Sequence, residues 1–323
     1  MDYIFQKRGQ IHMKLCKFIK MKLKKNNFIS LYYPYIKSKA KIIRNKLRSK
    51  SAVNKYLEKR YEKIFDEKLD WNNLITYTQK MHFYKLFMSD PQKTTLTDKI
   101  LVRDYVAAII GDKYLIPLIG VYNKFSEINI SLLPQSFVIK TNHGSGTNII
   151  VNEKSSANFK EIKTKIKLWM KLNFAYLEFE MQYRNIKPRI LIEQNMGSSD
   201  KMLDYKFLCF NGKVEFCWID FDRFTNHKRN VYNLNWELQE WNQFNYGNLM
   251  DSVEKPKNFE EMVEIASKLS EGFSHVRVDL YNIEGKIYFG EMTFTNGAGL
   301  EKLTNRNSDV LLGNLWGSSF KER

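Results

Sequence analysis

The chain has 323 residues, with 52 Lys plus Arg against 35 Asp plus Glu, which gives a formal net charge of +17. Hydrophobic residues make up 43% and aromatic residues 14%. This composition excludes global disorder and predicts one or two folded domains with a real core. Three cysteines (Cys16, Cys209 and Cys217) are too few for a disulfide scaffold and favour a reducing compartment.

The positive charge is concentrated near the start of the chain. Residues 1–50 contain 15 Lys or Arg and one acid, Asp2, whereas residues 51–323 contain 37 basic and 34 acidic residues. A nucleic-acid-binding protein is expected to carry a basic face on its folded part, so we predict no nucleic-acid partner. The sequence has no run of about 18 apolar residues and no compact apolar region at its start. We therefore expect neither a membrane-spanning helix nor a cleaved signal peptide, and a cytoplasmic location.

Residues 1–50 are predicted to form a basic amphipathic segment. Apolar residues recur at steps of three and four and share one helical face, and lysines fill most other positions. The apolar residues are Ile11, Leu15, Phe18, Ile19 and Leu23. Such a helix fits the anionic inner face of the cytoplasmic membrane, to which the protein would bind peripherally. It equally fits a helix packed on the folded body with its charged face in water.

Residues 51–130 are predicted to be mostly helical. Leu57, Tyr61 and Phe65 keep helical spacing, and a further helix is expected over residues 98–110. That helix should end at Gly111, because glycine is the residue most often found just after a helix.

After residue 131 the pattern predicts strands and hairpins with helices between them. We expect strands at 136–140, 149–151 and 189–193, and helices over 158–176 and 258–272. Asn211-Gly212 lies between two apolar runs over residues 204–219 and predicts a tight hairpin. Two further strands are expected at 275–281 and 287–294. This order of elements indicates the α+β class.

The last predicted hairpin carries two acids and an arginine on one face. With residues 282–286 taken as its loop, Asp279 would face Phe289 and Arg277 would face Glu291. Alternation then puts Arg277, Asp279, Glu291 and Thr293 on the same side. Two such carboxylates can hold Mg²⁺. A solvated outer face with an Arg–Glu pair explains the same pattern.

A glycine-containing loop follows the strand that ends at Lys140. A lysine at a strand end before such a loop can place its ammonium group on phosphate oxygens. The loop matches neither a Walker A motif nor a dinucleotide-binding GxGxxG motif, and an ordinary polar turn remains an alternative. His143 within it could be a ligand or a base, or a solvated imidazole.

Two further sets of polar residues lie in and after the next hairpin. Asp204 and Lys206 share strand parity and point to one side. Asp220-Phe221-Asp222 matches the short DxD pattern of glycosyltransferases that use nucleotide sugars.

The order of these motifs is more specific than any one of them. Read along the chain, they are Asp98-Lys99, FVIK, NHGSG, RILIEQ, DYKFLCFNGK and RVDLY followed by FGEMTFTNGAG. Over residues 95–315 this order resembles the ATP-grasp superfamily, and within it the TupA-like family of teichuronopeptide biosynthesis. The resemblance implies an α+β ATP-grasp fold, in which two lobes enclose ATP. It implies a helical region at 51–130, a first lobe at 131–200 with the glycine loop as its lid, and a second lobe at 201–323 with the metal site.

The resemblance also implies roles for individual residues. The phosphates would be held by Lys99, Lys140 and the lid residues His143, Gly144, Ser145 and Gly146. Glu193, Gln194 and Met196 would lie at the adenine and ribose end. One or two Mg²⁺ ions would bind Asp279, Glu291 and Thr293, where many relatives carry Asn in place of Thr293. Lys206, Arg223 and Arg277 would contact the transferred phosphoryl group or the substrate carboxylate.

The implied reaction is ATP-dependent ligation of a carboxylate to an amine through an acyl phosphate. The partners would be ATP, a carboxylated sugar such as a uronic acid of a bacterial surface polysaccharide or its precursor, and an amino acid or amino alcohol. The alternatives are a glycosyltransferase that uses Asp220 and Asp222, an ATP-grasp kinase that stops at the phosphorylated product, and a non-catalytic adaptor that acts through residues 1–50.

Overall fold

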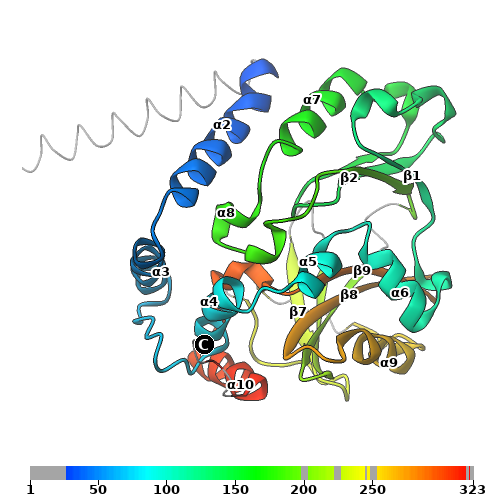
Figure 1. The fold of residues 1–323 in the computed structure, drawn as a ribbon. Coiled ribbons are helices and arrows are strands. Elements are labelled where there is room, and N and C mark those ends of the chain that lie inside the picture. Colours follow the sequence, from blue (N-terminus) through cyan, green and yellow to red (C-terminus); the bar gives the residue numbers. More distant parts are fainter. Residues whose placement is uncertain are drawn as a thin grey trace, which may run out of the picture.

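The computed structural model describes residues 27–197, 203–221, 227–243, 246–247, 253–317 and 320. The apolar face expected between Ile11 and Leu23 lies outside these residues. In the part of the chain that is described, nine strands form two antiparallel sheets, and helices cover them (Figure 1).

The helices dominate the first third of the chain, and the strands the rest. The α-helices are α2 (Asn27–Lys46), α3 (Lys50–Phe65), α4 (Tyr77–Phe87), α5 (Pro91–Thr97), α6 (Val102–Ile110), α7 (Phe159–Trp169), α8 (Ala175–Glu178), α9 (Phe259–Ser270) and α10 (Arg306–Trp316). Short 3₁₀ helices are η1 (Asp112–Tyr114), η2 (Phe125–Glu127), η3 (Ile130–Leu132), η4 (Lys154–Ser156), η5 (Met181–Tyr183) and η6 (Asn296–Gly299).

The two sheets define two lobes. The first sheet has the order β1-β4-β2-β3, formed by β1 (Leu118–Tyr122), β2 (Phe137–Thr141), β3 (Asn148–Val151) and β4 (Ile190–Gln194). The second has the order β7-β6-β5-β8-β9, formed by β5 (Leu203–Phe210), β6 (Lys213–Phe221), β7 (Lys228–Tyr232), β8 (His275–Ile283) and β9 (Lys286–Thr293).

Each sheet has its own apolar core. Ile162 and Ile166 of α7 pack with Ile139 and Ile192 of the first sheet. Leu269 and other apolar residues of α9 belong to the larger core that includes the second sheet. Figure 1 shows α9 against the second sheet and α7 beside the first. The fold is therefore α+β with two lobes, as the sequence predicts.

Several predicted elements are confirmed, and others need correction. Asn211 and Gly212 have φ values of 52° and 78°, so the hairpin turns as its sequence predicts. The helix expected over 158–176 ends at Trp169, and only the short α8 follows. Strand β1 was not predicted, because its five residues include Gly120 and lie within a largely helical region. It pairs with β4 and so belongs to the first lobe.

The predicted register of the last hairpin is wrong. The turn is two residues long, Glu284-Gly285, because Ile283 pairs with Lys286. A register shift between Asp279 and Leu280 then places Asp279 opposite Glu291. With a five-residue loop and a regular ladder, Asp279 would lie opposite Phe289 and Glu291 opposite Arg277, so one residue pair would lie between the two carboxylates. The turn and the shift bring them face to face.

The N-terminal helices are tied to the first lobe. Asn45 of α2 is buried and donates a hydrogen bond from Nδ2 to the Tyr176 carbonyl oxygen at 2.8 Å. Lys41 of α2 and Arg60 of α3 both form ion pairs with Glu178 at the end of α8. Figure 1 shows α2 running beside α7 and α8.

None of the helices that the structure describes has the length and apolar character needed to cross a lipid bilayer.

Candidate functional site

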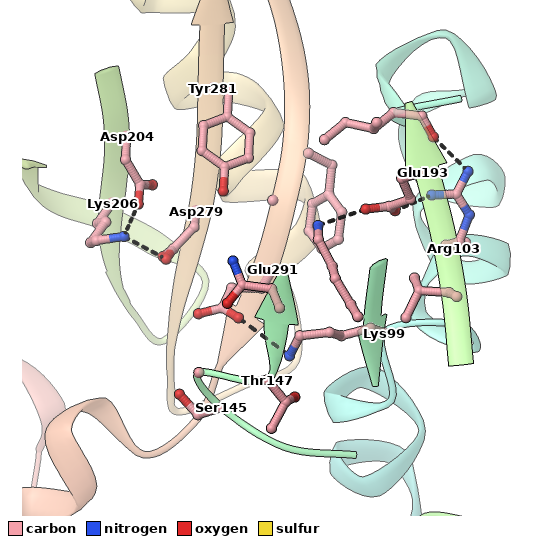
Figure 2. Close-up of a pocket in the computed structure, with 17 residues that line it drawn as sticks. Lys99, Arg103, Ser145, Thr147, Glu193, Asp204, Lys206, Asp279, Tyr281 and Glu291 are labelled. Carbon is pink, nitrogen blue, oxygen red and sulfur yellow. Dashed lines mark hydrogen bonds and ion pairs between the residues drawn. The ribbon is translucent and has the colours of Figure 1, made fainter. Parts of the chain in front are cut away.

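A cavity of about 230 Å³ lies between the two sheets, and we call it the first cavity. Charged residues from both lobes and apolar side chains such as Ile116, Tyr281 and Phe289 line it (Figure 2). Its polar lining residues are Lys99, Arg103, Lys140, Ser145, Thr147, Asn148, Glu193, Asp204, Lys206, Asp279 and Glu291. It also touches Gly146, Leu191 and Gly290.

The glycine loop between β2 and β3 forms one edge of the first cavity. The Lys99 amide donates to the Asn142 carbonyl at 3.2 Å, and Lys99 Nζ donates to the Gly144 carbonyl at 3.1 Å. A Cβ atom at Gly144 would lie 2.5 Å from the Phe174 ring, so only glycine fits there. These contacts fold the loop toward the cavity and keep its backbone close to Lys99.

The first lobe supplies a short chain of ion pairs. Lys140 Nζ lies 2.6 Å from Glu193 Oε2 on the neighbouring strand. Arg103 of α6 binds the other Glu193 oxygen at 3.1 Å and also the Ile116 carbonyl at 2.9 Å. Glu193 therefore has two cationic partners, and Lys140 has one acid.

The second lobe supplies a denser and more buried network. Lys206 Nζ lies 2.5 Å from Asp204 Oδ2, 2.9 Å from Asp279 Oδ2 and 3.6 Å from Asp220 Oδ2. Arg277 donates through Nε and Nη2 to the two Asp279 oxygens, both at 2.7 Å. All five side chains are buried, so each charge depends on its partners.

Glu291 is the most accessible carboxylate of this group. Its side chain is 41% exposed, and its oxygens lie 3.6 Å from Lys99 Nζ and 3.3 Å from Arg277 Nη2. Desolvation would raise the pKa of Glu291, but Lys99, Arg277 and Lys206 outweigh it and lower the pKa to about 2. Thr293 Oγ1 donates to Glu291 Oε1 at 3.0 Å. Glu291 is thus a stable anion that faces the cavity.

Helix α4 positions the loop that follows β9. Lys85 Nζ donates to the Ala298 carbonyl at 2.7 Å, and His82 Nε2 lies 3.0 Å from the Gly299 carbonyl. Both side chains are buried, and burial lowers the pKa of Lys85 to about 7. The loop in turn brings Asn296 into hydrogen-bond contact with Arg277.

A second cavity of about 420 Å³ adjoins the first and shares Ser145, Lys206 and Glu291 with it. It extends over the second sheet toward α8 and η6. Its remaining lining residues are Glu178, Glu180, Tyr183, Asp220, His227, Arg229, Tyr246, Arg277, Thr293, Thr295, Asn296, Gly297, Ala298, Leu300 and Glu301.

The structure gathers most of the predicted site residues. Lys99, Lys140, Ser145, Gly146, Glu193, Lys206, Asp279 and Glu291 line the first cavity, and Arg277 and Thr293 line the second. His143 lines neither cavity: it is buried, and its Nε2 atom lies 3.3 Å from the Trp169 carbonyl. Gln194 and Met196 follow at the end of β4 and are not lining residues. Arg223 and Asp222 lie outside the described residues.

Sequence reasoning missed several lining residues. Arg103 and Ile116 lie outside the quoted motifs, and only the pairing of distant segments brings them to the cavity. Phe289 begins the FGEMTFTNGAG motif but was given no role in the site. Asp204 was noted for its parity with Lys206, which was the one usable signal. Arg229 was also missed, although it lies directly opposite Asp220 across β6 and β7.

The donor types at β8 and β9 suit Mg²⁺, but both Asp279 oxygens accept hydrogen bonds from Arg277, so a bound ion would have to displace these contacts or bind mainly through Glu291. Asp279 and Glu291 present carboxylates from opposite positions, and Mg²⁺ is usually held by one or two carboxylates together with waters and phosphate oxygens. Within the described ranges, no three His, Cys, Asp or Glu side chains gather as a metal-binding group. Thr293 Oγ1 accepts a hydrogen bond from Arg277 Nη2 at 3.1 Å and donates one to Glu291 Oε1 at 3.0 Å. The predicted third metal ligand therefore already has two partners.

Comparison with known protein families decides the relationship. The sequence model of the family described as TupA-like ATPgrasp matches residues 78–316, about three quarters of the chain. The chain belongs to the TupA-like ATP-grasp family. No curated protein sequence matches it.

Solved structures with a similar fold are distant. D-alanine–D-alanine ligase from Bacillus anthracis complexed with ATP has 15% identity and a TM-score of 0.36, over 62% of this chain and 54% of that one. D-cycloserine synthetase DcsG has 12% identity and a TM-score of 0.40, over 71% and 72%. The ATP-grasp ligase PsnB complexed with a minimal precursor has 9% identity and a TM-score of 0.34, over 64% and 55%. The chain spans little more than half the length of the first of these proteins.

Proposed function

We propose that this protein is an ATP-dependent carboxylate–amine ligase that works through an acyl phosphate. The observation that carries the proposal is the first cavity, in which Lys99, Lys140 and Lys206 surround Asp279 and Glu291 between two antiparallel sheets. Three ammonium groups suit a polyphosphate, and two carboxylates suit the cation that accompanies it. Membership of an ATP-grasp family points to the same nucleotide.

In this proposal the two lobes that line the first cavity have separate tasks. Lys99, Lys140 and the backbone of the glycine loop bind the phosphates. Asp279 and Glu291 hold Mg²⁺, which supplies charge neutralisation on the phosphate oxygens when it is bound. Ile116, Tyr281 and Phe289 offer apolar surface to the base. Lys206 and Arg277 stabilise negative charge on the transferred phosphoryl group and on the carboxylate that receives it.

The chemistry follows from the leaving group. A carboxylate cannot expel oxide, so a carboxylate oxygen first bonds to the γ-phosphorus while the bond from that phosphorus to ADP breaks. An amine then attacks the acyl carbon, and phosphate leaves with the bonding electrons. The protein has to position the reactants and exclude water from the acyl phosphate. That task explains a site built from Lys, Arg and acids.

The finer part of the proposal concerns the substrates. We propose that the carboxylate belongs to a uronic acid of a bacterial surface polysaccharide or its precursor, and that the nucleophile is an amino acid or an amino alcohol. The teichuronopeptide family resemblance supports the first part. The second cavity supports the presence of a further substrate, because it opens onto Lys206 and Glu291 beside the first.

Trapping with hydroxylamine tests the reaction class. The full chain is incubated with ATP, Mg²⁺, hydroxylamine and either glucuronate or galacturonate, and hydroxamate and ADP are measured. The ligase proposal predicts hydroxamate that depends on both ATP and the uronate. A stable phosphorylated sugar without hydroxamate would assign a kinase instead. ADP without either product would reject these uronates as substrates.

We also propose that α2 docks this enzyme on an anionic lipid surface. Three apolar residues of α2, Tyr33 (52%), Ile36 (60%) and Ile43 (51%), are exposed along one face, and Leu47 (80%), directly after the helix, continues their spacing. Lys37 and Arg44 border this stripe on one side, and Lys39 and Lys46 border it on the other. Residues 27–50 contain no acid. An exposed apolar stripe between two cationic rows suits the headgroup region of an anionic bilayer.

Vesicle flotation tests the lipid proposal. The full chain should float with phosphatidylcholine vesicles that contain about 30% phosphatidylglycerol, and only weakly with phosphatidylcholine alone. Leu47→Asp should reduce binding at least about tenfold. The matched control is Leu132→Asp, because Leu132 is equally exposed (80%) but far from α2 in the sequence. Failure of the wild-type chain to float, or dimerisation that Leu47→Asp abolishes, would contradict the proposal.

A glycosyltransferase that uses Asp220 and Asp222 remains the second candidate. Asp220 is held by Arg229 and has Lys206 and His227 nearby. Burial would raise the pKa of Asp220, but the contacts with Arg229 hold it well below its ordinary value. An anion that already faces Arg229 and Lys206 has little need of a metal ion.

A further inference from the structure

A third cavity, of about 290 Å³, lies outside the site described above. Three segments line it: α5 with the turn that follows it, the end of β1, and the stretch that leads into β4. Its described lining residues belong to neither the first nor the second cavity. Its volume is close to the lower limit for pockets that hold small ligands.

Two cations in the third cavity are accessible and have charge left for a ligand. The Arg189 side chain is 26% exposed, and among the described residues its ion-pair partner is Asp98 at 3.6 Å, which is too long for a hydrogen bond. Lys187 is exposed, and its ammonium group has no ion pair or hydrogen bond within the described ranges. A guanidinium and an ammonium group that ligands can reach together suit a carboxylate.

The acid in this lining already has other partners. Asp98 is only 2% exposed. Its Oδ1 atom accepts hydrogen bonds from the amides of Ile100 and Leu101 at 2.8 and 3.4 Å, and its Oδ2 atom accepts one from Asn142 Nδ2 at 2.8 Å. Both carboxylate oxygens are therefore engaged, and the accessible charge of the third cavity is positive.

The rest of the lining suits a sugar ring. The side-chain amides of Asn123 and Asn185 are exposed and form no hydrogen bond with any residue that the structure describes. Each amide offers donors and an acceptor, which neighbouring hydroxyl groups require. Leu101 is 40% exposed and adds apolar surface. A small inorganic anion would use neither feature, whereas a carboxylated sugar would use both.

Asn142 holds the cationic stretch in place and ties it to the glycine loop. Its buried side chain accepts a hydrogen bond from the Arg189 amide at 2.6 Å and donates one to the Lys187 carbonyl at 3.0 Å. Asp98 lines the third cavity, and the next residue, Lys99, lines the first. The two cavities therefore adjoin at residues 98 and 99.

We propose that the third cavity binds a carboxylated sugar unit, with its carboxylate on Arg189 and Lys187 and its hydroxyl groups on Asn123 and Asn185. The inference rests on the proposed ligase function and deepens it, because the bound unit belongs to the same glycan as the uronic acid that is activated. Binding of one unit raises the effective concentration of another at the first cavity. The acceptor is therefore an oligomer or polymer, and a free uronate binds without this second contact.

Calorimetry with acidic and neutral sugars of matched length tests the inference. Full-length protein with Mg²⁺ and the ATP analogue AMP-PNP is titrated with trigalacturonate, galacturonate and maltotriose in about 150 mM salt, which screens binding to exposed lysines elsewhere. Trigalacturonate should bind at least about tenfold more tightly than either of the other sugars. Inorganic phosphate forms a further arm and should not displace trigalacturonate.

Three variants locate the binding. Arg189→Gln and Lys187→Gln each remove one charge from the third cavity and should weaken trigalacturonate binding about tenfold. Asn123→Asp adds a negative charge to the same cavity and should also weaken it. The matched control is Arg184→Gln, because Arg184 is exposed and lines none of the three cavities. AMP-PNP binding by each variant checks that the variant is folded.

The outcomes separate this inference from the ligase proposal. If trigalacturonate binds in an Arg189-dependent way but AMP-PNP does not bind the wild type, the ligase proposal fails and the sugar site stands. If AMP-PNP binds but trigalacturonate binds no more tightly than galacturonate or maltotriose, the inference alone is overturned. Equal losses in Arg189→Gln and Arg184→Gln, or displacement of trigalacturonate by phosphate, also overturn it.

Discussion

The two lobes that line the first cavity differ in how their charged side chains are paired. In the first lobe, Lys140, Glu193 and Arg103 form a simple chain at a partly open edge. In the second lobe, Lys206 and Arg277 lie buried among Asp204, Asp220 and Asp279, and most of their polar atoms already have partners.

Under the proposed function, this difference suits the first lobe to binding the phosphates and the second lobe to stabilising the transferred phosphoryl group. The Lys140 and Arg103 side chains keep some solvent contact, at 21% and 15% exposure, and only Glu193 is buried. Lys140 has a single internal partner, so it can exchange that partner for phosphate oxygens while Glu193 stays paired with Arg103. A buried network cannot lose one member without leaving another charge unpaired in a medium of low polarity. The second lobe therefore keeps its groups in fixed positions before the substrates arrive, which is what stabilisation of a developing charge requires.

The largest predicted effect is the loss of stability on Lys206→Met. The substitution leaves Asp204 and Asp279 without their shared ammonium partner and should lower the free energy of unfolding by about 3–5 kcal/mol. Urea unfolding measures this change. Lys213→Met on β6 is the control, because Lys213 is exposed. Equal stabilities for the two variants would show that the network is not a structural unit.

The next effect is on turnover rather than on stability. Glu291→Gln should reduce ATP-dependent turnover at least about 100-fold, because it removes one of the two carboxylates proposed to hold Mg²⁺. The fold should survive, since the Glu291 side chain is 41% exposed. Steady-state ADP release measures turnover, and Glu284→Gln in the turn of the same hairpin serves as the control. Full activity in Glu291→Gln would remove this residue from the site.

A smaller effect is expected in the first lobe. Lys140→Met should weaken AMP-PNP binding by about tenfold, which corresponds to 1.4 kcal/mol. Stability should change little, because Glu193 keeps its pair with Arg103 at 3.1 Å. Calorimetric titration and urea unfolding of the same preparation separate the two readouts. A large loss of stability in Lys140→Met with unchanged AMP-PNP affinity would contradict a role for Lys140 in binding phosphates and would assign it a structural role instead.

The smallest effect concerns pH. The pKa of Glu291 is lowered from 4.5 to about 2 in the folded protein. Its ionised form therefore contributes stability above pH 4.5, and this contribution is lost as the pH falls from 4.5 through about 2. Because the group is partly exposed, the contribution is about 1 kcal/mol or less. The difference in unfolding free energy between wild type and Glu291→Gln should shrink between pH 5 and pH 2.5. If the difference in unfolding free energy does not change with pH, the ion pairs of Glu291 with Lys99 and Arg277 are contradicted.

The contrast between the two lobes also explains what could be predicted from the sequence. Asp279 and Glu291 lie in strand motifs whose alternation sets the side-chain direction, so their grouping with Arg277 and Thr293 on one face was foreseeable. The exact opposition of Asp279 and Glu291 was not, because it depends on a register shift within a ladder. Arg103, Ile116 and Arg229 reach the cavities only through tertiary pairing. No local pattern marks such residues, and strand β1 was missed for the same reason.

The most direct test of the account is which nucleotide the wild-type chain binds. Calorimetric titration of the full chain with AMP-PNP in the presence of Mg²⁺ should show one site per chain, and titration with UDP-glucose under the same conditions should show none. Binding of UDP-glucose without binding of AMP-PNP would contradict the account and favour the glycosyltransferase.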